Sequence, residues 1–171
     1  MTVGIHPRME ISPSFRLCDF TASRVADRYG LYNLPRDVSI VANLKALSKN
    51  VLEVIISRTG KHLTLLSGYR SVTLNRLLGG PFDSPHVFGE GVDFLISGTS
   101  VEDAALMIAA MDDLPFDTLV HERRQLSNGD VQAWLHLSHK RLGPNRGAVQ
   151  TALTQGGTRT LNDGLLTRNA A

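Results

Sequence analysis

The sequence predicts an α+β fold in which N-terminal helices pack on a small, mainly antiparallel sheet. Three observations predict it. Apolar residues recur at three- and four-residue steps through residues 39–56, apolar runs of strand length follow after residue 61, and Asn128-Gly129 separates two of these runs as in a hairpin. The 171 residues, 42% of them hydrophobic, suffice for one domain with its own core, and the single cysteine, Cys18, excludes an intramolecular disulfide.

Helices are expected in the first half of the chain. Residues 1–13 form an irregular N-terminal arm, and short helices follow between residues 15 and 29, with Ser14 or Thr21 as N-caps. The spacing of apolar residues through 39–56 predicts a longer amphipathic helix, because such steps place them on one face.

The second half alternates strands with two short helices. Apolar runs typical of strands span residues 62–66, 92–96, 116–122 and 132–138. A brief helix is expected at 71–78, and a capping box formed by Ser100 and Asp103 begins another.

The chain is expected to have three parts. Residues 14–147 form the folded domain, after the arm of residues 1–13. Residues 148–171 are rich in Thr, Gly and Asn, and we expect a polar C-terminal tail that needs outside contacts to become ordered.

Charge and hydropathy exclude several classes of partner. The formal net charge is only +2 and Lys and Arg form no run, which argues against a nucleic-acid interface. No apolar run is long enough for a membrane span or a secretory signal. We therefore expect synthesis in the cytoplasm without a signal peptide.

Two imidazoles and a carboxylate form a candidate metal site. His86 and Asp93 are separated by a loop with Gly89 and Gly91, which lets both side chains turn toward one centre, and strand alternation leaves His136 free to face a cleft. This mixed nitrogen and oxygen set suits a catalytic zinc with one open position. Taken alone the spacing is a weak motif, since a single His is more often a hydrogen-bonded structural residue.

Six motifs occur in the order found in a known family. They are Ser67-Gly-Tyr-Arg-Ser71, Leu74-Asn75-Arg76, Gly79-Gly80, Ser84-x-His86-x-x-Gly89-x-x-x-Asp93, Phe116-Asp117-x-Leu119-x-x-Glu122 and Trp134-x-His136-x-Ser138. Over about residues 10–147 the chain resembles the zinc D-Ala-D-Ala carboxypeptidase family, which includes peptidoglycan endopeptidases. It is most similar to the short branch common in phages and prophages. The resemblance implies a hedgehog/DD-peptidase-like fold.

The resemblance implies a role for each residue of the site. His86, Asp93 and His136 bind Zn²⁺, Glu122 is the general base, and Arg70 holds a substrate carboxylate or carbonyl. Peptide hydrolysis needs a metal-bound water of lowered pKa. It also needs a carboxylate that takes a proton from this water and passes it to the leaving amine. The alternatives are a solvated Glu122 and a structural ion pair between Arg70 and a nearby Asp.

Two more residues are candidates for binding substrate. One difference from some members of the family concerns the general base. Ser84 contacts substrate or fixes the loop of the first His, and Trp134 walls the cleft or fills the core. Some family members carry an acidic residue where this chain has Ala133, which makes Asp130 the reserve candidate for the general base. His139 and His121 are expected on the opposite strand face and outside the ligand set.

The expected function is hydrolysis of peptidoglycan stem peptides by a zinc metallopeptidase. It would act as a D-Ala-D-Ala carboxypeptidase or as a cross-link or stem-peptide endopeptidase, encoded by a phage or prophage, made in the host cytoplasm and active on the cell wall as an endolysin. The alternative is a phage virion structural protein that has kept the fold and binds other virion proteins through its arm and tail. A particle-borne lysin would combine both.

Overall fold

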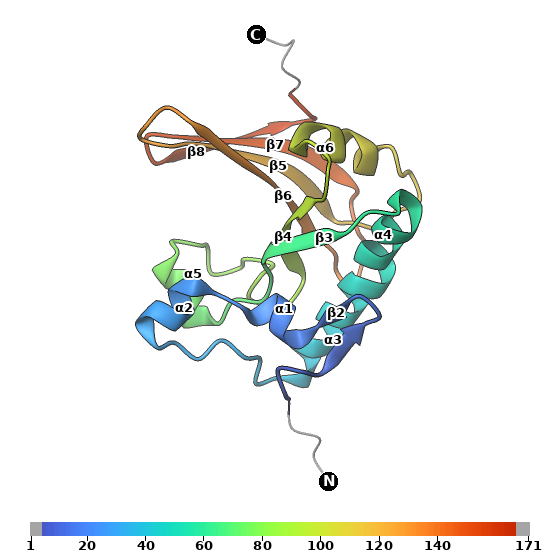
Figure 1. The fold of residues 1–171 in the computed structure, drawn as a ribbon, viewed down its shortest axis with the longest axis vertical. Coiled ribbons are helices and arrows are strands. Elements are labelled where there is room, and N and C mark those ends of the chain that lie inside the picture. The colour runs from blue at the N-terminus through green and yellow to red at the C-terminus, as the bar shows by residue number, and fades with distance from the viewer. Residues whose placement is uncertain (1–4, 167–171) are drawn as a thin grey trace.

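The computed structural model describes residues 5–166 of the chain (Figure 1). The elements are β1 (Glu10–Ser12), β2 (Phe15–Arg16), α1 (Leu17–Thr21), α2 (Arg24–Tyr29), α3 (Val38–Leu47), η1 (Ser48–Leu52), α4 (Glu53–Thr59), β3 (Leu63–Ser67), α5 (Val72–Leu77), β4 (Gly91–Ile96), α6 (Val101–Ala109), β5 (Thr118–Gln125), β6 (Val131–Ser138), β7 (Ala148–Gln155) and β8 (Thr158–Asp163). Within the described part of the chain, no helix has the length and apolar character needed to span a membrane.

The main sheet has six strands in the order β3-β4-β6-β5-β7-β8 (Figure 1). Every pair is antiparallel except β5 and β7, which run parallel. Strands β1 and β2 form a separate antiparallel pair near the N-terminus. The α+β class and the mainly antiparallel sheet that the sequence predicts are therefore confirmed.

The long helix expected at residues 39–56 is present and extends over α3, η1 and α4. Its middle turns are π-helical at Ser48–Leu52, which shifts the register of the apolar face by one residue. Leu44, Val51 and Ile55 remain fully buried across this shift. The helix ends at Gly60, whose positive φ of 64° is the left-handed conformation that glycine adopts readily.

The two faces of the sheet have different surroundings. Helix α6 contacts β4, β5 and β6 and buries Ala105 and Ile108 against Leu119 and Leu135 on one face. Alternation along β6 turns the neighbouring side chains, including His136, to the opposite face. That second face lines an open cleft.

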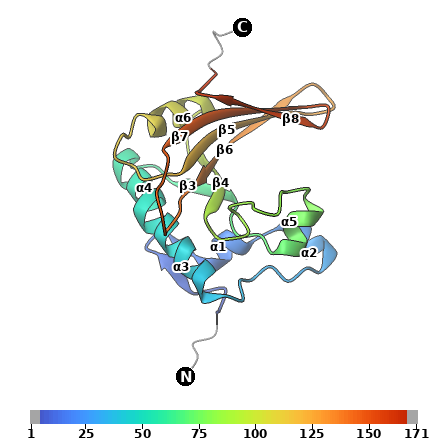
Figure 2. The same cartoon turned by 180° about the vertical axis from the view of Figure 1, so that it is seen from behind.

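The prediction of a polar tail at residues 148–171 is wrong for residues 148–163, and residues 167–171 lie outside the described range. Residues 148–155 and 158–163 form β7 and β8 of the main sheet, and Ala152 is fully buried (Figure 2). Gly156 and Gly157 both have positive φ and make the tight turn between these strands. The polar composition of these residues suggested a tail, but they form a β-hairpin because β7 pairs with β5.

The N-terminal predictions also need correction. Part of the expected arm is ordered, since β1 begins at Glu10 and Ile11 is buried, while residues 1–4 lie outside the described range. The caps of the short helices are Arg16 and Ser23 rather than the expected residues. Ser14 lies in the β1–β2 turn, where both its amide and its hydroxyl bind the Glu53 carboxylate.

Candidate metal centre

The three expected metal ligands come together at the floor of the cleft. Asp93 on β4 is the cross-strand partner of His136 on β6, and His86 comes from the loop before β4. The ligand atoms lie within 4.8 Å of one another. Asp93 Oδ1 is 2.8 Å from His136 Nδ1 and 3.3 Å from His86 Nε2.

These distances suit a small tetrahedral cation. Ligand atoms about 2.0–2.1 Å from a tetrahedral zinc ion are separated from one another by about 3.3 Å. Two imidazoles and one carboxylate are also a donor set that zinc accepts in catalytic sites while it keeps a position open. The residues present therefore fit zinc.

The His86 ring is held in the tautomer that a metal ligand needs. Its Nδ1 lies 2.7 Å from the carbonyl oxygen of Gly68 and donates to it, which leaves the Nε2 lone pair directed at Asp93. Burial lowers the pKa of His86, so the neutral ligand form is favoured. A side chain at Gly68 would come within 2.6 Å of the Phe20 carbonyl oxygen, which explains glycine at this position.

Arg70 holds the third ligand from the side away from the histidines. Its Nη2 donates to Asp93 Oδ2 at 2.7 Å, and its Nε donates to Ser67 Oγ at 2.8 Å. Burial raises the pKa of Asp93, but His86 and His136 outweigh that effect and hold the pKa well below its ordinary value. The alternative ion pair expected for Arg70 is thus present, and Arg70 also lines the cleft.

The backbone around Arg70 is clamped by one buried amide. Asn33 donates from Nδ2 to the carbonyl oxygens of Thr21 and Tyr69, and its Oδ1 accepts from the Ser71 amide. Arg70 itself donates its amide to the His86 carbonyl. The loops that carry two of the site residues are therefore bound to each other and to the N-terminal helices.

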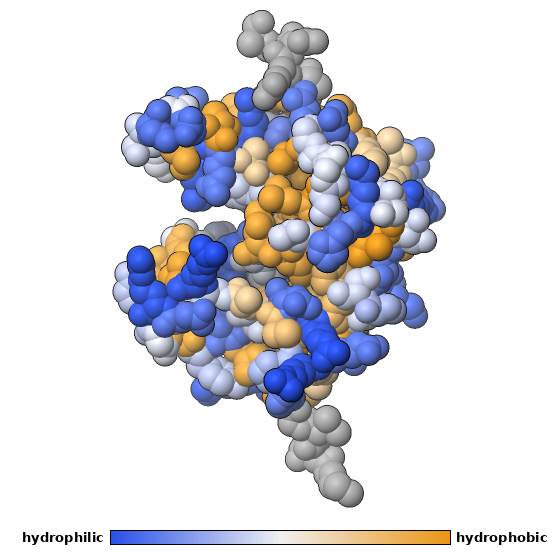
Figure 3. All heavy atoms as spheres, in the orientation of Figure 1, coloured by the Kyte–Doolittle hydropathy of each residue, from blue (hydrophilic) through white to orange (hydrophobic). Residues whose placement is uncertain are grey.

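The cleft has a volume of about 310 Å³ and separates two parts of the molecule (Figure 3). Its lining includes the metal ligands together with Arg70, Gly79, Gly80, Pro81, Ser84, Glu122, Arg124, Trp134, Thr154 and Arg159. The predicted metal ligands, the predicted base Glu122 and the predicted substrate-binding residues therefore border one space. Their assigned roles stay predictions.

Glu122 is not the solvated residue that the alternative proposed. It is only 8% exposed, on the face of β5 that borders the cleft, and its carboxylate pairs with Arg159 on β8. Ser84 is buried beside the first His and lines the cleft. Trp134 is half-buried and forms part of the wall, with the Arg124 guanidinium 5.3 Å from its ring centroid.

The reserve candidate for the base and the two histidines expected outside the ligand set lie elsewhere. Asp130 is in the β5–β6 turn, where it bonds to Asn128, and it does not line the cleft. His121 faces the α6 side of the sheet, and His139 is bound to the Pro115 carbonyl. The expectation that these two histidines stay outside the ligand set agrees with the cluster found among the described residues.

Sequence reasoning assigned no role to two arginines of the cleft, Arg124 and Arg159. Arg124 follows Glu122 by two residues on one strand, so alternation alone could have placed both on the same face. Arg159 carries no such signal, because its place depends on the pairing of β8 with β7 and of β7 with β5.

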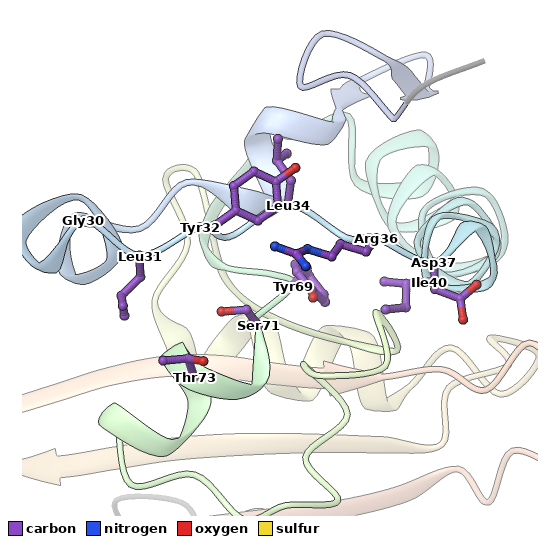
Figure 4. Close-up of a pocket in the computed structure, with 10 residues that line it drawn as sticks. All are labelled: Gly30, Leu31, Tyr32, Leu34, Arg36, Asp37, Ile40, Tyr69, Ser71 and Thr73. Carbon is purple, nitrogen blue, oxygen red and sulfur yellow. The ribbon is translucent and has the colours of Figure 1, made fainter. Parts of the chain in front are cut away.

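A second cavity, of about 460 Å³, is lined in part by Tyr69 and Ser71, the two neighbours of Arg70 in the chain (Figure 4). Arg36 and Tyr32 form part of its wall, with the guanidinium carbon 5.3 Å from the Tyr32 ring centroid. It shares none of the metal ligands and is separate from the cleft described above.

Comparison with models of protein families gives a match. A family model described as Peptidase M15 matches residues 13–125, which is well over half of the chain. The matched region contains Arg70, His86, Asp93 and Glu122 and ends before His136. A search of curated proteins found no match.

Proposed function

Because the chain belongs to the peptidase M15 family, we propose that it is a zinc-dependent peptidase that hydrolyses peptide bonds of peptidoglycan. Its substrate would be a stem peptide or cross-link, cut as a D-Ala-D-Ala carboxypeptidase or as an endopeptidase. The observation that carries the proposal is the meeting of His86, Asp93 and His136 with the Glu122 carboxylate in one cleft.

His86, Asp93 and His136 would hold a zinc ion, which would supply the Lewis acidity that polarises a peptide carbonyl and makes water more acidic. Glu122 takes a proton from the attacking water as the C–O bond forms, and it then delivers that proton to the leaving nitrogen as the C–N bond breaks. Arg70 fixes Asp93 and presents a cation beside the scissile carbonyl. The open cleft leaves room for an extended peptide.

The biological setting remains a prediction from the resemblance. A phage or prophage origin, action on the cell wall and carriage on a virion belong to it. The alternative of a virion structural protein rested on a C-terminal tail free to bind neighbours. It has lost that support, because residues 148–163 belong to the sheet.

Metal content and muropeptide release from purified peptidoglycan test the proposal. We expect one zinc per chain and soluble products from the wild type, and neither from His86→Ala. His62→Ala, which changes an exposed histidine outside the cleft, is the matched control and should behave as wild type. Zinc without products from the wild type would contradict the proposed activity.

A further inference from the structure

The cleft contains one positive charge that its own carboxylates do not neutralise. Three arginines and two carboxylates line it. Arg70 pairs with Asp93 and Arg159 pairs with Glu122, whereas Arg124 has no acidic partner among residues 5–166. The protein therefore offers an excess positive charge to whatever enters the cleft, before any metal adds to it.

Contact with the Trp134 ring preorganises the Arg124 guanidinium for binding a ligand. The guanidinium carbon lies 5.3 Å from the ring centroid, at a distance typical of cation–π stacking. Stacking engages one face of the guanidinium, while its N–H donors lie in the plane and point outward from the edge. A carboxylate can accept two of these N–H groups side by side. Partial immobilisation on the ring also reduces the entropy lost on binding.

The position of Arg124 defines where that carboxylate must lie on the substrate. Arg124 and Glu122 are two residues apart on β5 and both border the cleft. Their Cα atoms are therefore about 6.7 Å apart, and an extended peptide spans about 3.3–3.6 Å per residue. A group that reaches Arg124 belongs to a residue about two positions from the bond beside Glu122.

We infer that Arg124, supported by Trp134, forms a subsite for a free carboxylate of the substrate about two residues from the scissile bond. This inference rests on the proposed function. Stem peptides contain acidic residues whose carboxylates are either free or amidated, and amidation removes the charge while it changes little of the shape. The subsite therefore selects stem peptides with a free carboxylate.

Hydrolysis of two matched muropeptides, with that carboxylate free or amidated, tests the subsite. We expect wild type to prefer the free form in kcat/KM by about tenfold or more, as for a charge-assisted hydrogen bond. Arg124→Gln should lose this preference by losing rate on the free form alone. Arg123→Gln is the matched control, because it removes the same charge from the opposite face of the same strand.

Two results overturn the subsite: no preference in the wild type, or equal losses on both substrates in Arg124→Gln. Trp134 is the only tryptophan, so its fluorescence also reports binding without turnover, in a Glu122→Gln background. Tighter binding of the free form that disappears with Arg124→Gln supports the subsite. If neither muropeptide is hydrolysed, the proposed function fails, and the titration alone then decides the subsite.

Discussion

Glu122 and Arg159 form a two-point ion pair across the sheet, with Arg159 Nη2 2.5 Å from Oε1 and Nε 3.4 Å from Oε2. They belong to β5 and β8, and β7 lies between these strands. The strand residue opposite Glu122 on β7 is Ala152, whose small side chain leaves the space above it to the guanidinium. The proposed general base is therefore oriented by a residue beyond the end of the family match.

Arg159→Ala should lower kcat by about tenfold to a hundredfold, because a small displacement of a catalytic group is costly. Zinc content should stay unchanged, since Arg159 contacts none of the metal ligands directly. Added guanidine should restore part of the lost rate, which a purely structural defect would not allow. Thr160→Ala, an exposed neighbour on β8, is the control. Unchanged kcat in Arg159→Ala would mean that the ion pair does not orient the base.

Glu122→Gln should keep zinc and lose hydrolysis by about 10²–10⁴-fold, the usual contribution of a general base. The amide keeps the shape of the side chain and cannot take a proton from water. Zinc stoichiometry and muropeptide release, measured on one preparation, separate the two effects. Hydrolysis by Glu122→Gln near the wild-type rate would show that another residue is the general base.

Asn33→Asp should destabilise the protein by about 3 kcal/mol. The change turns an oxygen toward the carbonyl oxygens of Thr21 and Tyr69, where the amide nitrogen now donates. Denaturant unfolding measures the loss. Asn162→Asp, on the exposed strand β8, should cost little. An Asn33→Asp variant as stable as wild type would show that the clamp around Arg70 contributes no stability.

Asp117→Asn should destabilise the protein by about 2 kcal/mol at neutral pH. Hydrogen bonds from Arg146 hold the pKa of this buried carboxyl below its ordinary 3.8. A lowered folded-state pKa contributes stability that is complete above the unfolded value and is lost as pH falls through the folded one.

The difference between wild type and Asp117→Asn should therefore shrink as pH drops below about 4. Unfolding midpoints measured across this range provide the test. Asp112→Asn, which removes the charge of an exposed aspartate five residues earlier, is the matched control. A difference for Asp117→Asn that stays constant down to acid pH would exclude the ion pair as its cause.

Local patterns predicted the elements whose signal lies within a few residues. Ser100 is the N-cap of α6 and its hydroxyl accepts from the Asp103 amide, which is the N-cap half of the predicted capping box. The apolar spacing of residues 39–56 lies within the long helix. Strand alternation predicted that His136 faces a cleft, and the side chain lines the cleft together with Trp134. These features depend on one segment at a time.

Features that depend on distant strands were not predictable in the same way. Residues 148–163 are polar, and only their pairing with β5 makes them part of the sheet. The place of Arg159 beside Glu122 follows from that pairing, as does the second wall of the cleft. The Gly156-Gly157 turn was a local signal for this hairpin, but composition outweighed it.

Strand β6 follows β5 along the chain but lies between β4 and β5 in the sheet. Asp93 and His136 are 43 residues apart, and contacts of such separation form slowly. We therefore expect the three ligands to come together only late in folding. An ion bound by them would stabilise the native state and not the transition state for folding. It would slow unfolding and leave the folding rate almost unchanged. The order of strands thus connects metal binding to the lifetime of the native state, which governs survival among proteases when cleavage outpaces reclosing.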